Sequence, residues 1–211
     1  MNRIVFCDFN GTITDRDMLG TLAAPSRHDE NSAGTVDSGS SESVTLRAEI
    51  SSLAASITLS REEAERVLEE RLRFDDSFRT FARSCRTAGI ELIVLTSGVA
   101  ELIERYLTRR GVIGLPVIGN EAEYSQTGWR IHFRDRSPDG NAKFPYVMDA
   151  RRRHCETIVI GDDESDFEAA VVADRRFAKR NSPLDRFLSA NALAHVPFDS
   201  FDEIAPEITR L

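Results

Sequence analysis

Three short apolar runs, each followed at once by small and polar residues, constrain the fold of this 211-residue chain more than any other feature. The runs span residues 4–7, 92–95 and 157–160, and the sequences that follow them are DFNGT, TSG and GDDESD. Short, largely apolar runs bounded by turn-forming residues are typical of buried parallel strands. We therefore predict three central strands with polar clusters at their carboxyl ends.

Helical patterns alternate with these strands along much of the chain. We predict helices at residues 77–87, 99–110, 144–153 and 166–173, and two weaker strands at residues 176–178 and 195–198. Two pairs have the spacing of capping boxes at helix starts, namely Ser165 with Glu168 and Ser200 with Glu203. Strands that alternate with helices predict an α/β fold, here a doubly wound, Rossmann-like parallel sheet with helices on both faces.

Residues 16–76 interrupt this alternation and have a helical character. A capping-box pair, Ser60 with Glu63, precedes a helix that we expect to run to about Leu72. We predict a helical cap at 16–76, inserted into a core that comprises residues 1–15 and 77–211.

Two further segments have no place in the regular alternation. Residues 24–43 contain one large aliphatic side chain, and we expect a mobile loop that is either a plain connector or a lid over the site. Residues 117–133 alternate in polarity and predict a small β-hairpin that turns near residues 126–128.

The composition limits the partners. The net charge of −8 argues against a nucleic acid bound by general electrostatics, but a metal or a local cation can still attract a small anion. We expect no signal peptide and no membrane span, because the first apolar run is short and no run approaches about 20 apolar residues. Three cysteines without a C-x-x-C pair favour reduced thiols, so we expect a cytoplasmic protein. The oligomeric state is left open.

The polar clusters predict a phosphate chemistry once they are brought together. Parallel sheets bind ligands at the carboxyl ends of their strands, so Asp8 and the acids at 162, 163 and 166 are expected to meet there. Oxygen ligands from two strand ends suit Mg²⁺. A metal that screens the charge of a phosphate makes a nearby carboxylate a plausible nucleophile, which would form an aspartyl-phosphate.

The remaining polar residues of the clusters suit a phosphoryl group. Thr96 offers a hydroxyl and Lys143 offers a cation for the oxygens on which transition-state charge develops. Backbone amides of two short segments, Gly11–Thr12 and Ser97–Gly98, would complete an anion cradle.

The sequences DFNGTIT, the strand that ends at Thr96, Lys143 and GDDESD resemble, in order, the four motifs of the haloacid dehalogenase-like (HAD) hydrolases. The resemblance covers the whole predicted core, and four motifs in order are far more specific than a lone D-x-x-G-T. DFNGTIT, KFPYV and IVIGDDESDFEAA look most like the phosphoserine phosphatase-like branch. Within that branch they are most similar to the methionine-salvage phosphatase for 2-hydroxy-3-keto-5-methylthiopentenyl 1-phosphate. The resemblance implies a Mg²⁺-dependent hydrolase of small phosphomonoesters.

Carried over residue by residue, the resemblance implies a role for each motif position. Asp8 would be the nucleophile and a metal ligand, Asp162 a Mg²⁺ ligand, and Asn10 a ligand through its backbone carbonyl. Thr96 and Lys143 would bind the phosphate, and Asp166 would belong to the metal site, where it orients Lys143 or a metal-bound water. Asp163 is either part of the metal shell or a turn residue, and Asp17 is either a substrate contact or a structural cap.

Position 10 departs from the family pattern, in which most phosphatases have Asp. That Asp protonates the departing alkoxide and later activates water, and Asn can do neither. General acid–base assistance contributes about 10²–10⁴-fold, so turnover would be slow unless the leaving group is good. The alternatives are a low-activity or specialised enzyme, a phosphate-ester-binding or regulatory protein on the same scaffold, and a laboratory substitution that traps a complex.

Overall fold

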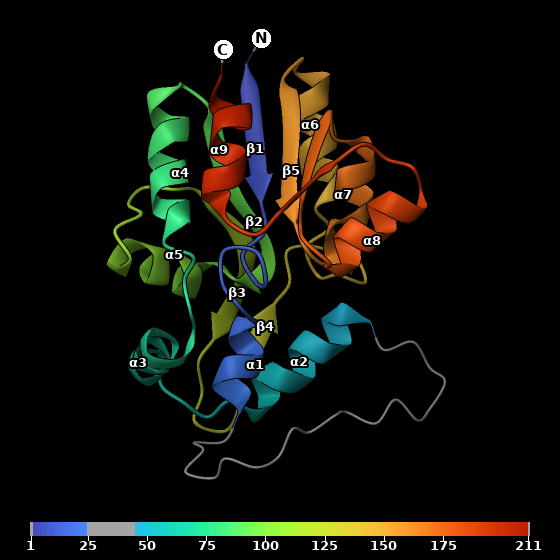
Figure 1. Cartoon of the computed structure of the whole chain (residues 1–211). Coiled ribbons are helices and arrows are strands. Elements are labelled where there is room, and N and C mark those ends of the chain that lie inside the picture. Colours follow the sequence, from blue (N-terminus) through green and yellow to red (C-terminus); the bar gives the residue numbers. More distant parts are fainter. Residues whose placement is uncertain (1, 25–44, 211) are drawn as a thin grey trace.

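The structure, a computed structural model, describes residues 2–24 and 45–210, and its centre is a seven-stranded sheet of order β4-β3-β2-β1-β5-β6-β7 (Figure 1). The strands are β1 (Arg3–Cys7), β2 (Glu91–Val99), β3 (Val117–Glu123), β4 (Arg130–His132), β5 (Glu156–Gly161), β6 (Arg175–Lys179) and β7 (Val196–Phe198). All neighbouring pairs are parallel except β3 and β4. The first strand of the chain, β1, therefore lies between the strands that end in the other two polar clusters.

Helices cover both faces of the sheet because successive side chains of a strand point to opposite faces. One face carries α4 (Ser77–Thr87), α5 (Ala100–Arg109) and α9 (Phe201–Thr209), and the other carries α6 (Phe144–Arg152), α7 (Phe167–Val172) and α8 (Pro183–Ala190). Along β1, Val5 and Cys7 pack into the first apolar core, whereas Ile4 and Phe6 pack into the second. Each fully buried large side chain contributes about 1.5–3 kcal/mol, so two cores hold β1 firmly in place.

The helices α1 (Met18–Ala23), α2 (Leu46–Ser56) and α3 (Arg61–Arg71) lie beyond the carboxyl ends of the central strands (Figure 1). The chain leaves the sheet and returns to it along one path, because Thr14 forms an antiparallel bridge with Phe74. Asp15 N also donates to Arg73 O over 3.1 Å. The helical segment is thus joined to the sheet at two adjacent crossings.

The β3–β4 hairpin supports α2 from the edge of the sheet. Trp129 N donates to Ala54 O over 2.9 Å, and Trp129 Nε1 donates to Leu59 O over 2.7 Å. At the other end of α2, Arg47 N donates to Pro138 O over 2.7 Å. Gly128 has φ +122°, and a Cβ there would lie 2.3 Å from Ala55 O. Only glycine permits this close approach of hairpin and helix.

Most of the elements predicted from sequence are confirmed, including the parallel sheet, the hairpin and the boxes at Ser60–Glu63 and Ser200–Glu203. The prediction of a capping box at Ser165 was wrong. The hydroxyl of Ser165 donates to Asp163, and the box is formed by Asp163 with Asp166 at a 3₁₀ helix, η1 (Glu164–Asp166). The strand predicted at 92–95 is also longer, since β2 runs to Val99 and includes Thr96.

Some sequence predictions concern parts that the structure does not test. Residues 25–43 of the expected mobile loop lie outside the described residues. Of the helices within residues 2–24 and 45–210, none combines the length and the apolar character needed to cross a membrane.

Candidate active site

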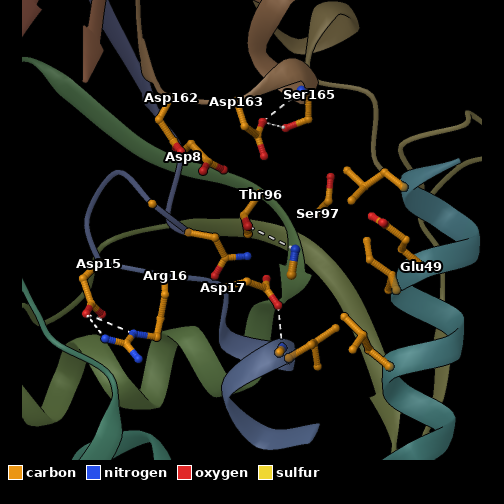
Figure 2. A pocket seen from close by; sticks show the side chains of 18 of the residues that line it. Asp8, Asp15, Arg16, Asp17, Glu49, Thr96, Ser97, Asp162, Asp163 and Ser165 are labelled. Atoms are coloured by element: carbon orange, nitrogen blue, oxygen red, sulfur yellow. Dashed lines mark hydrogen bonds and ion pairs between the residues drawn. The ribbon is translucent and has the colours of Figure 1, made fainter. Parts of the chain in front are cut away.

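A cavity of about 670 Å³ lies between the carboxyl ends of the central strands and the helices α1 and α2 (Figure 2). Strand ends supply Asp8, Thr96 and Asp162, and the helical segment supplies Leu19, Glu49 and Leu53, among others. The polar clusters of three strands therefore open into one shared cavity. The two walls come from parts of the chain that are well separated in sequence.

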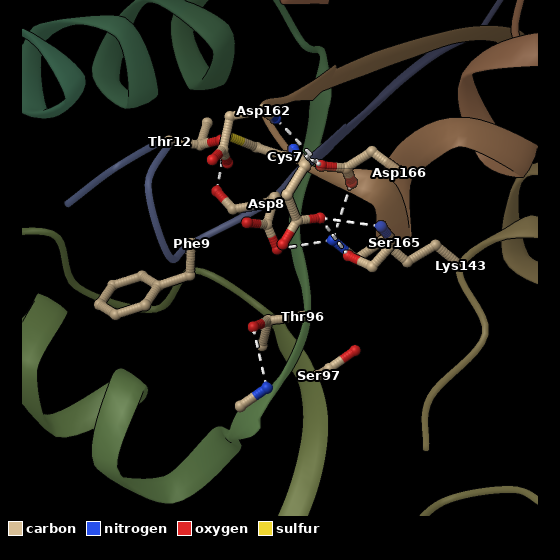
Figure 3. Close-up of polar contacts among 12 residues, drawn as sticks. Cys7, Asp8, Phe9, Thr12, Thr96, Ser97, Lys143, Asp162, Ser165 and Asp166 are labelled. Atoms are coloured by element: carbon tan, nitrogen blue, oxygen red, sulfur yellow. Dashed lines mark hydrogen bonds and ion pairs between the residues drawn. The ribbon is translucent and has the colours of Figure 1, made fainter. Parts of the chain in front are cut away.

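A buried ion-pair chain forms the floor of this site (Figure 3). Lys143 Nζ lies 2.7 Å from Asp8 Oδ1 and 2.8 Å from Asp166 Oδ1, and the side chains are 3%, 4% and 1% exposed, respectively. Asp8 follows β1, and its amide continues the sheet by donating to Ile160 O over 2.9 Å. The structure brings these three predicted residues together at one place. Their roles in catalysis stay predictions.

The second oxygen of Asp166 organises the turn after β5. Asp166 Oδ2 accepts from Asp162 N over 3.0 Å and from Asp163 N over 3.4 Å. Gly161 permits this arrangement, because a Cβ there would lie 2.2 Å from Asp166 Oδ2. Asp166 therefore fixes both the ammonium of Lys143 and the backbone that carries Asp162.

Asp162 faces Asp8 across the end of the sheet. Its Oδ1 accepts from Thr12 Oγ1 over 2.6 Å, and Leu184 N donates to its backbone carbonyl over 2.9 Å. Gly11 has φ +76°, and a Cβ there would lie 2.2 Å from Asp162 Oδ2. The glycine and threonine of the first polar cluster thus hold the acid of the third.

The three carboxylates carry more negative charge than Lys143 balances. Burial raises the pKa of Asp8, against the effect of Lys143, and burial also raises the pKa of Asp166. The pKa of Asp162 is raised to about 7 by burial and by Asp166. Burial alone would lower the pKa of Lys143, but Asp166 and Asp8 raise it above its usual value. The lysine therefore stays charged, and the acids favour either protons or a further cation.

The donor set fits a divalent cation. Carboxylate oxygens of Asp8, Asp162 and Asp166 lie within 4.8 Å of one another. Hard divalent cations such as Mg²⁺ prefer oxygen ligands and neutralise charge that one ammonium leaves unbalanced. Since both oxygens of Asp166 already accept hydrogen bonds, Asp8 and Asp162 are the better placed ligands. The predicted ligation by the Asn10 carbonyl stays a prediction.

Thr96, Ser97 and Gly98 form the opposite side of the site. Gly98 N donates to Thr96 Oγ1 over 3.0 Å, and Ser97 is only 8% exposed. Two buried asparagines hold this segment by its carbonyls. Asn141 Nδ2 donates to Thr96 O over 2.7 Å, and Asn120 Nδ2 donates to Ser97 O over 2.7 Å.

The sequence reasoning did not find these two asparagines. Asn120 lies in β3, where its Oδ1 also accepts from Arg134 N over 3.0 Å, and Asn141 lies two residues before Lys143. The one available sequence signal was the amide side chain of Asn120, which lies in a segment whose pattern otherwise predicts an edge hairpin. The carbonyl of Ser97, to which this amide donates, can be identified only from the structure.

Asn10 and Asp17 lie where the chain leaves the sheet for α1. Asn10 Oδ1 accepts from Met18 N over 3.1 Å, and Asp17 Oδ1 accepts from Gly20 N over 2.5 Å. Asp17 therefore caps α1, as the structural alternative predicted. Both residues also line the cavity, and although Asp17 is exposed there, partial desolvation by the surrounding protein raises the pKa of its carboxyl.

Asp163 has a structural role and also faces the cavity. Its Oδ1 accepts from Ser165 N over 2.9 Å and from Ser165 Oγ over 2.7 Å, so it begins η1. Figure 2 shows its side chain at the rim, above Thr96 and Ser97. The turn alternative is confirmed by these contacts, and a place in the metal shell stays a prediction.

Residues 5–170 match the family model of the haloacid dehalogenase-like hydrolases. The chain is 27% identical to Pdp3-interacting factor 1 of Schizosaccharomyces pombe, over 98% of this chain and 95% of that protein. It is 25% identical to the polyol phosphate phosphatase PYP1 of Saccharomyces cerevisiae, over 95% and 90%. It is 27% identical to 2-hydroxy-3-keto-5-methylthiopentenyl-1-phosphate phosphatase of Microcystis aeruginosa, over 97% and 96%.

A solved structure shares the fold. It is a phospho-aspartyl intermediate analogue of phosphoserine phosphatase, with a TM-score of 0.68 at 13% identity. The alignment covers 98% of this chain and 99% of the other. At this identity the likeness shows the fold alone, an α/β Rossmann-like sheet with helices beyond its carboxyl edge.

Proposed function

The chain belongs to the haloacid dehalogenase-like hydrolase family, and from that premise we propose that it hydrolyses small phosphomonoesters through a phosphorylated Asp8, with Mg²⁺ as cofactor. The observation that carries the proposal is the pairing of Asp8 with buried Lys143, beside Asp162, at the floor of the cavity. The names of two full-length relatives, a polyol phosphate phosphatase and a methylthiopentenyl phosphate phosphatase, support it.

Asp8 acts as the nucleophile in this proposal. Lys143 binds Asp8 Oδ1, which leaves Oδ2 to attack phosphorus. A bond then forms between Asp8 and phosphorus while the ester P–O bond breaks, and the leaving oxygen departs as an alkoxide that takes a proton from water. Water next attacks the aspartyl-phosphate, which releases inorganic phosphate and restores the carboxylate.

Asp8 and Asp162 would hold the cation, with Asp166 behind them. Bound Mg²⁺ would neutralise part of the charge between the carboxylates and the incoming phosphate. Thr96 and the amides of the first and second polar clusters would bind phosphoryl oxygens, and Lys143 would add a fixed positive charge. Asn120 and Asn141 keep the Thr96 segment facing this group through its carbonyls.

Asn10 limits the proposed reaction. Its Oδ1 accepts from Met18 N, so its amide nitrogen points away from Met18. An amide donates a hydrogen bond but cannot transfer a proton to the departing alkoxide. Turnover of alkyl phosphates is therefore slow, whereas a leaving group that needs no proton is released faster.

The test compares p-nitrophenyl phosphate with an alkyl phosphate, each with Mg²⁺ and with EDTA. We expect Mg²⁺-dependent phosphate release, faster from the aryl ester, and none from Asp8→Asn. Acid quenching during turnover should trap one phosphoryl group on the peptide that contains Asp8. If neither ester is hydrolysed while inorganic phosphate still binds with Mg²⁺, the chain is instead a phosphate-ester-binding protein on this scaffold.

We also propose that residues 1–15 and 77–211 form the catalytic core and 16–76 the cap. The adjacent crossings at Thr14–Phe74 and Asp15–Arg73 support this division, because they join the segment to the sheet at one place. A cytoplasmic location stays a prediction from the sequence.

A further inference from the structure

The cavity above the nucleophile is lined by acids well beyond the metal-binding pair. Among the described residues, its acidic side chains are Asp8, Asp15, Asp17, Glu49, Asp162 and Asp163. Arg16, the one basic side chain among the described lining residues, is paired with Asp15 through contacts of 2.6 and 3.0 Å. A metal at Asp8 and Asp162 would neutralise those two acids. It would leave the negative charge of the other unpaired acids of the cavity lining uncompensated.

Two of these acids stand where the alcohol part of a phosphate ester would lie. Figure 2 shows Asp17 reaching in from the start of α1 and Glu49 from the first turn of α2, on different sides of one space. Both line the same cavity as Asp8 and Thr96. A phosphoryl group at Asp8 and Thr96 therefore places the rest of the ester between α1 and α2.

An unpartnered hydroxyl on the third side points independently to a ligand. Ser97 is 92% buried, and its Oγ has no hydrogen-bond partner among the residues that the structure describes. It lines the cavity between the phosphate-facing Thr96 and Glu49 of α2 (Figure 2). Buried polar groups are nearly always satisfied, so an orphaned hydroxyl beside a cavity marks a place for a ligand group. Carboxylates on the other sides accept hydrogen bonds and repel anions.

We propose, on the basis of the phosphatase function proposed above, that Glu49 is a specificity-determining residue. Together with Asp17 and Ser97 it selects phosphate esters of uncharged, hydroxyl-bearing alcohols and rejects phosphorylated carboxylic acids. The hydroxyls of such an alcohol donate to the carboxylates and pair with Ser97. A carboxylate in the same place meets like charges at short range. Specificity is then achieved largely by repulsion of the wrong substrate.

The size of the effect follows from the position of Glu49 at the cavity wall. Glu49 is an exposed side chain, so its repulsion of a nearby anion is partly screened. At an effective dielectric constant between those of water and protein, one like charge at close range changes kcat/KM by roughly tenfold. Reversing the charge removes a repulsion and adds an attraction, so it should shift a preference by on the order of a hundredfold.

A matched pair of substrates isolates this charge. Glycerol 1-phosphate and 3-phosphoglycerate share one carbon skeleton and differ in a hydroxymethyl group against a carboxylate. The measurement is the ratio of their kcat/KM values with Mg²⁺, because active-site concentration cancels in a ratio. The variants are Glu49→Gln and Glu49→Lys. The control is Glu70→Lys, which makes the same charge change at an exposed position of α3 outside the cavity.

The wild-type protein should prefer glycerol 1-phosphate. Glu49→Gln should reduce the preference by roughly tenfold and Glu49→Lys should abolish or reverse it, while Glu70→Lys leaves it unchanged. The same order should hold for dissociation constants of the two compounds with Mg²⁺, so slow turnover does not prevent the test.

Two results would overturn the inference while leaving the proposed function intact. One is a preference for 3-phosphoglycerate. The other is a ratio that does not move in Glu49→Lys although thermal stability falls, as expected if Glu49 serves only the dipole of α2. If the wild-type protein hydrolysed neither of these substrates nor p-nitrophenyl phosphate, the phosphatase proposal itself would be refuted.

Discussion

Lys143 Nζ lies 2.7 Å from Asp8 Oδ1, although 135 residues separate the two in sequence and both side chains are almost completely buried. The start of α6 and the end of β1 are brought together by β5 and the turn after it. Asp166, in that turn, binds the same ammonium over 2.8 Å. The proposed nucleophile is therefore held in place and paired with a cation before any ligand binds.

Lys143→Met should abolish hydrolysis and weaken the fold. The substitution keeps the length of the side chain but leaves Asp8 and Asp166 buried without their cation. Removing one partner of a buried ion pair costs about 3–5 kcal/mol. Urea unfolding and phosphate release at saturating Mg²⁺ measure the two effects.

The matched control is Lys179→Met, which removes a less buried lysine that pairs with Asp75 over 3.4 Å. It should leave hydrolysis unchanged. If Lys143→Met retained most of the wild-type rate, Lys143 would have no part in phosphate binding.

Asn10→Asp should raise the turnover of an alkyl phosphate by about 10²–10⁴-fold, because the carboxyl can transfer a proton to the leaving oxygen. The turnover of p-nitrophenyl phosphate should rise far less, since its leaving group needs little protonation. Steady-state kinetics on both esters provide the comparison. Asn10→Ala removes the contact to Met18 N without adding an acid, and it should not accelerate either ester. An equal rise with both esters would argue against a proton-transfer role at position 10.

Without divalent cations the stability of the protein should fall as the pH rises from about 4 to about 7. The folded pKa of Asp162 is raised to about 7, above its usual value, by burial and by Asp166. The folded state therefore binds a proton that the unfolded chain has released in this window, and the stabilisation is lost as the pH passes the folded pKa. Thermal unfolding in EDTA across this range measures the slope.

Asp162→Asn should reduce this slope, to which Asp8 and Asp166 also contribute, whereas Glu70→Gln, at an exposed acid of α3, should leave it in place. Added Mg²⁺ should stabilise the wild-type protein most near the upper end of the window, where the carboxylates are charged. A wild-type slope of the opposite sign in EDTA would contradict the assignment.

Asn120→Asp and Asn141→Asp should each reduce kcat/KM by roughly ten- to a hundredfold, because each replaces a buried donor by an acceptor that faces a backbone carbonyl. The loss should fall mainly on KM for the ester and on the dissociation constant of inorganic phosphate, since the Thr96 segment binds the phosphoryl group. Asn191→Asp makes the same change where an exposed amide bonds to Phe187 O. If the variants lost stability while KM was unchanged, both asparagines would have only a structural role.

The sheet could be predicted because its central strands are buried on both faces and therefore read as apolar runs. Elements whose signals are local and polar were harder to find. The start of α8 combines Ser182 as a cap, Pro183 in the first turn and Asp185, yet no helix was predicted there. At η1, two candidate caps compete within three residues, and Asp163 rather than Ser165 accepts the backbone hydrogen bond.

The residues of the candidate site divide in the same way. Asp8, Thr96, Lys143 and Asp162 could be predicted to meet, since each lies at a strand end or a helix start. Their geometry now agrees with that expectation, although their roles await experiment. Asn120, Asn141 and Glu49 could not be predicted, because what matters about each is a neighbour from a distant segment. Such contacts follow from the packing of α2 and the hairpin, which no local pattern encodes.

The way in which α2 is attached has a consequence for how enzymes of this kind diversify. Its ends are held largely by main-chain bonds, from Arg47 N to Pro138 O and from Trp129 N to Ala54 O. Main-chain bonds do not depend on the identity of the side chain at the position that makes them. Position 49 is exposed and makes neither of these bonds, so it is free to mutate without loosening the helix, which Ile50 and Ala54 also hold in the core. Substitutions at exposed positions of this helix can therefore change the range of substrates during evolution, while the catalytic residues below it stay the same.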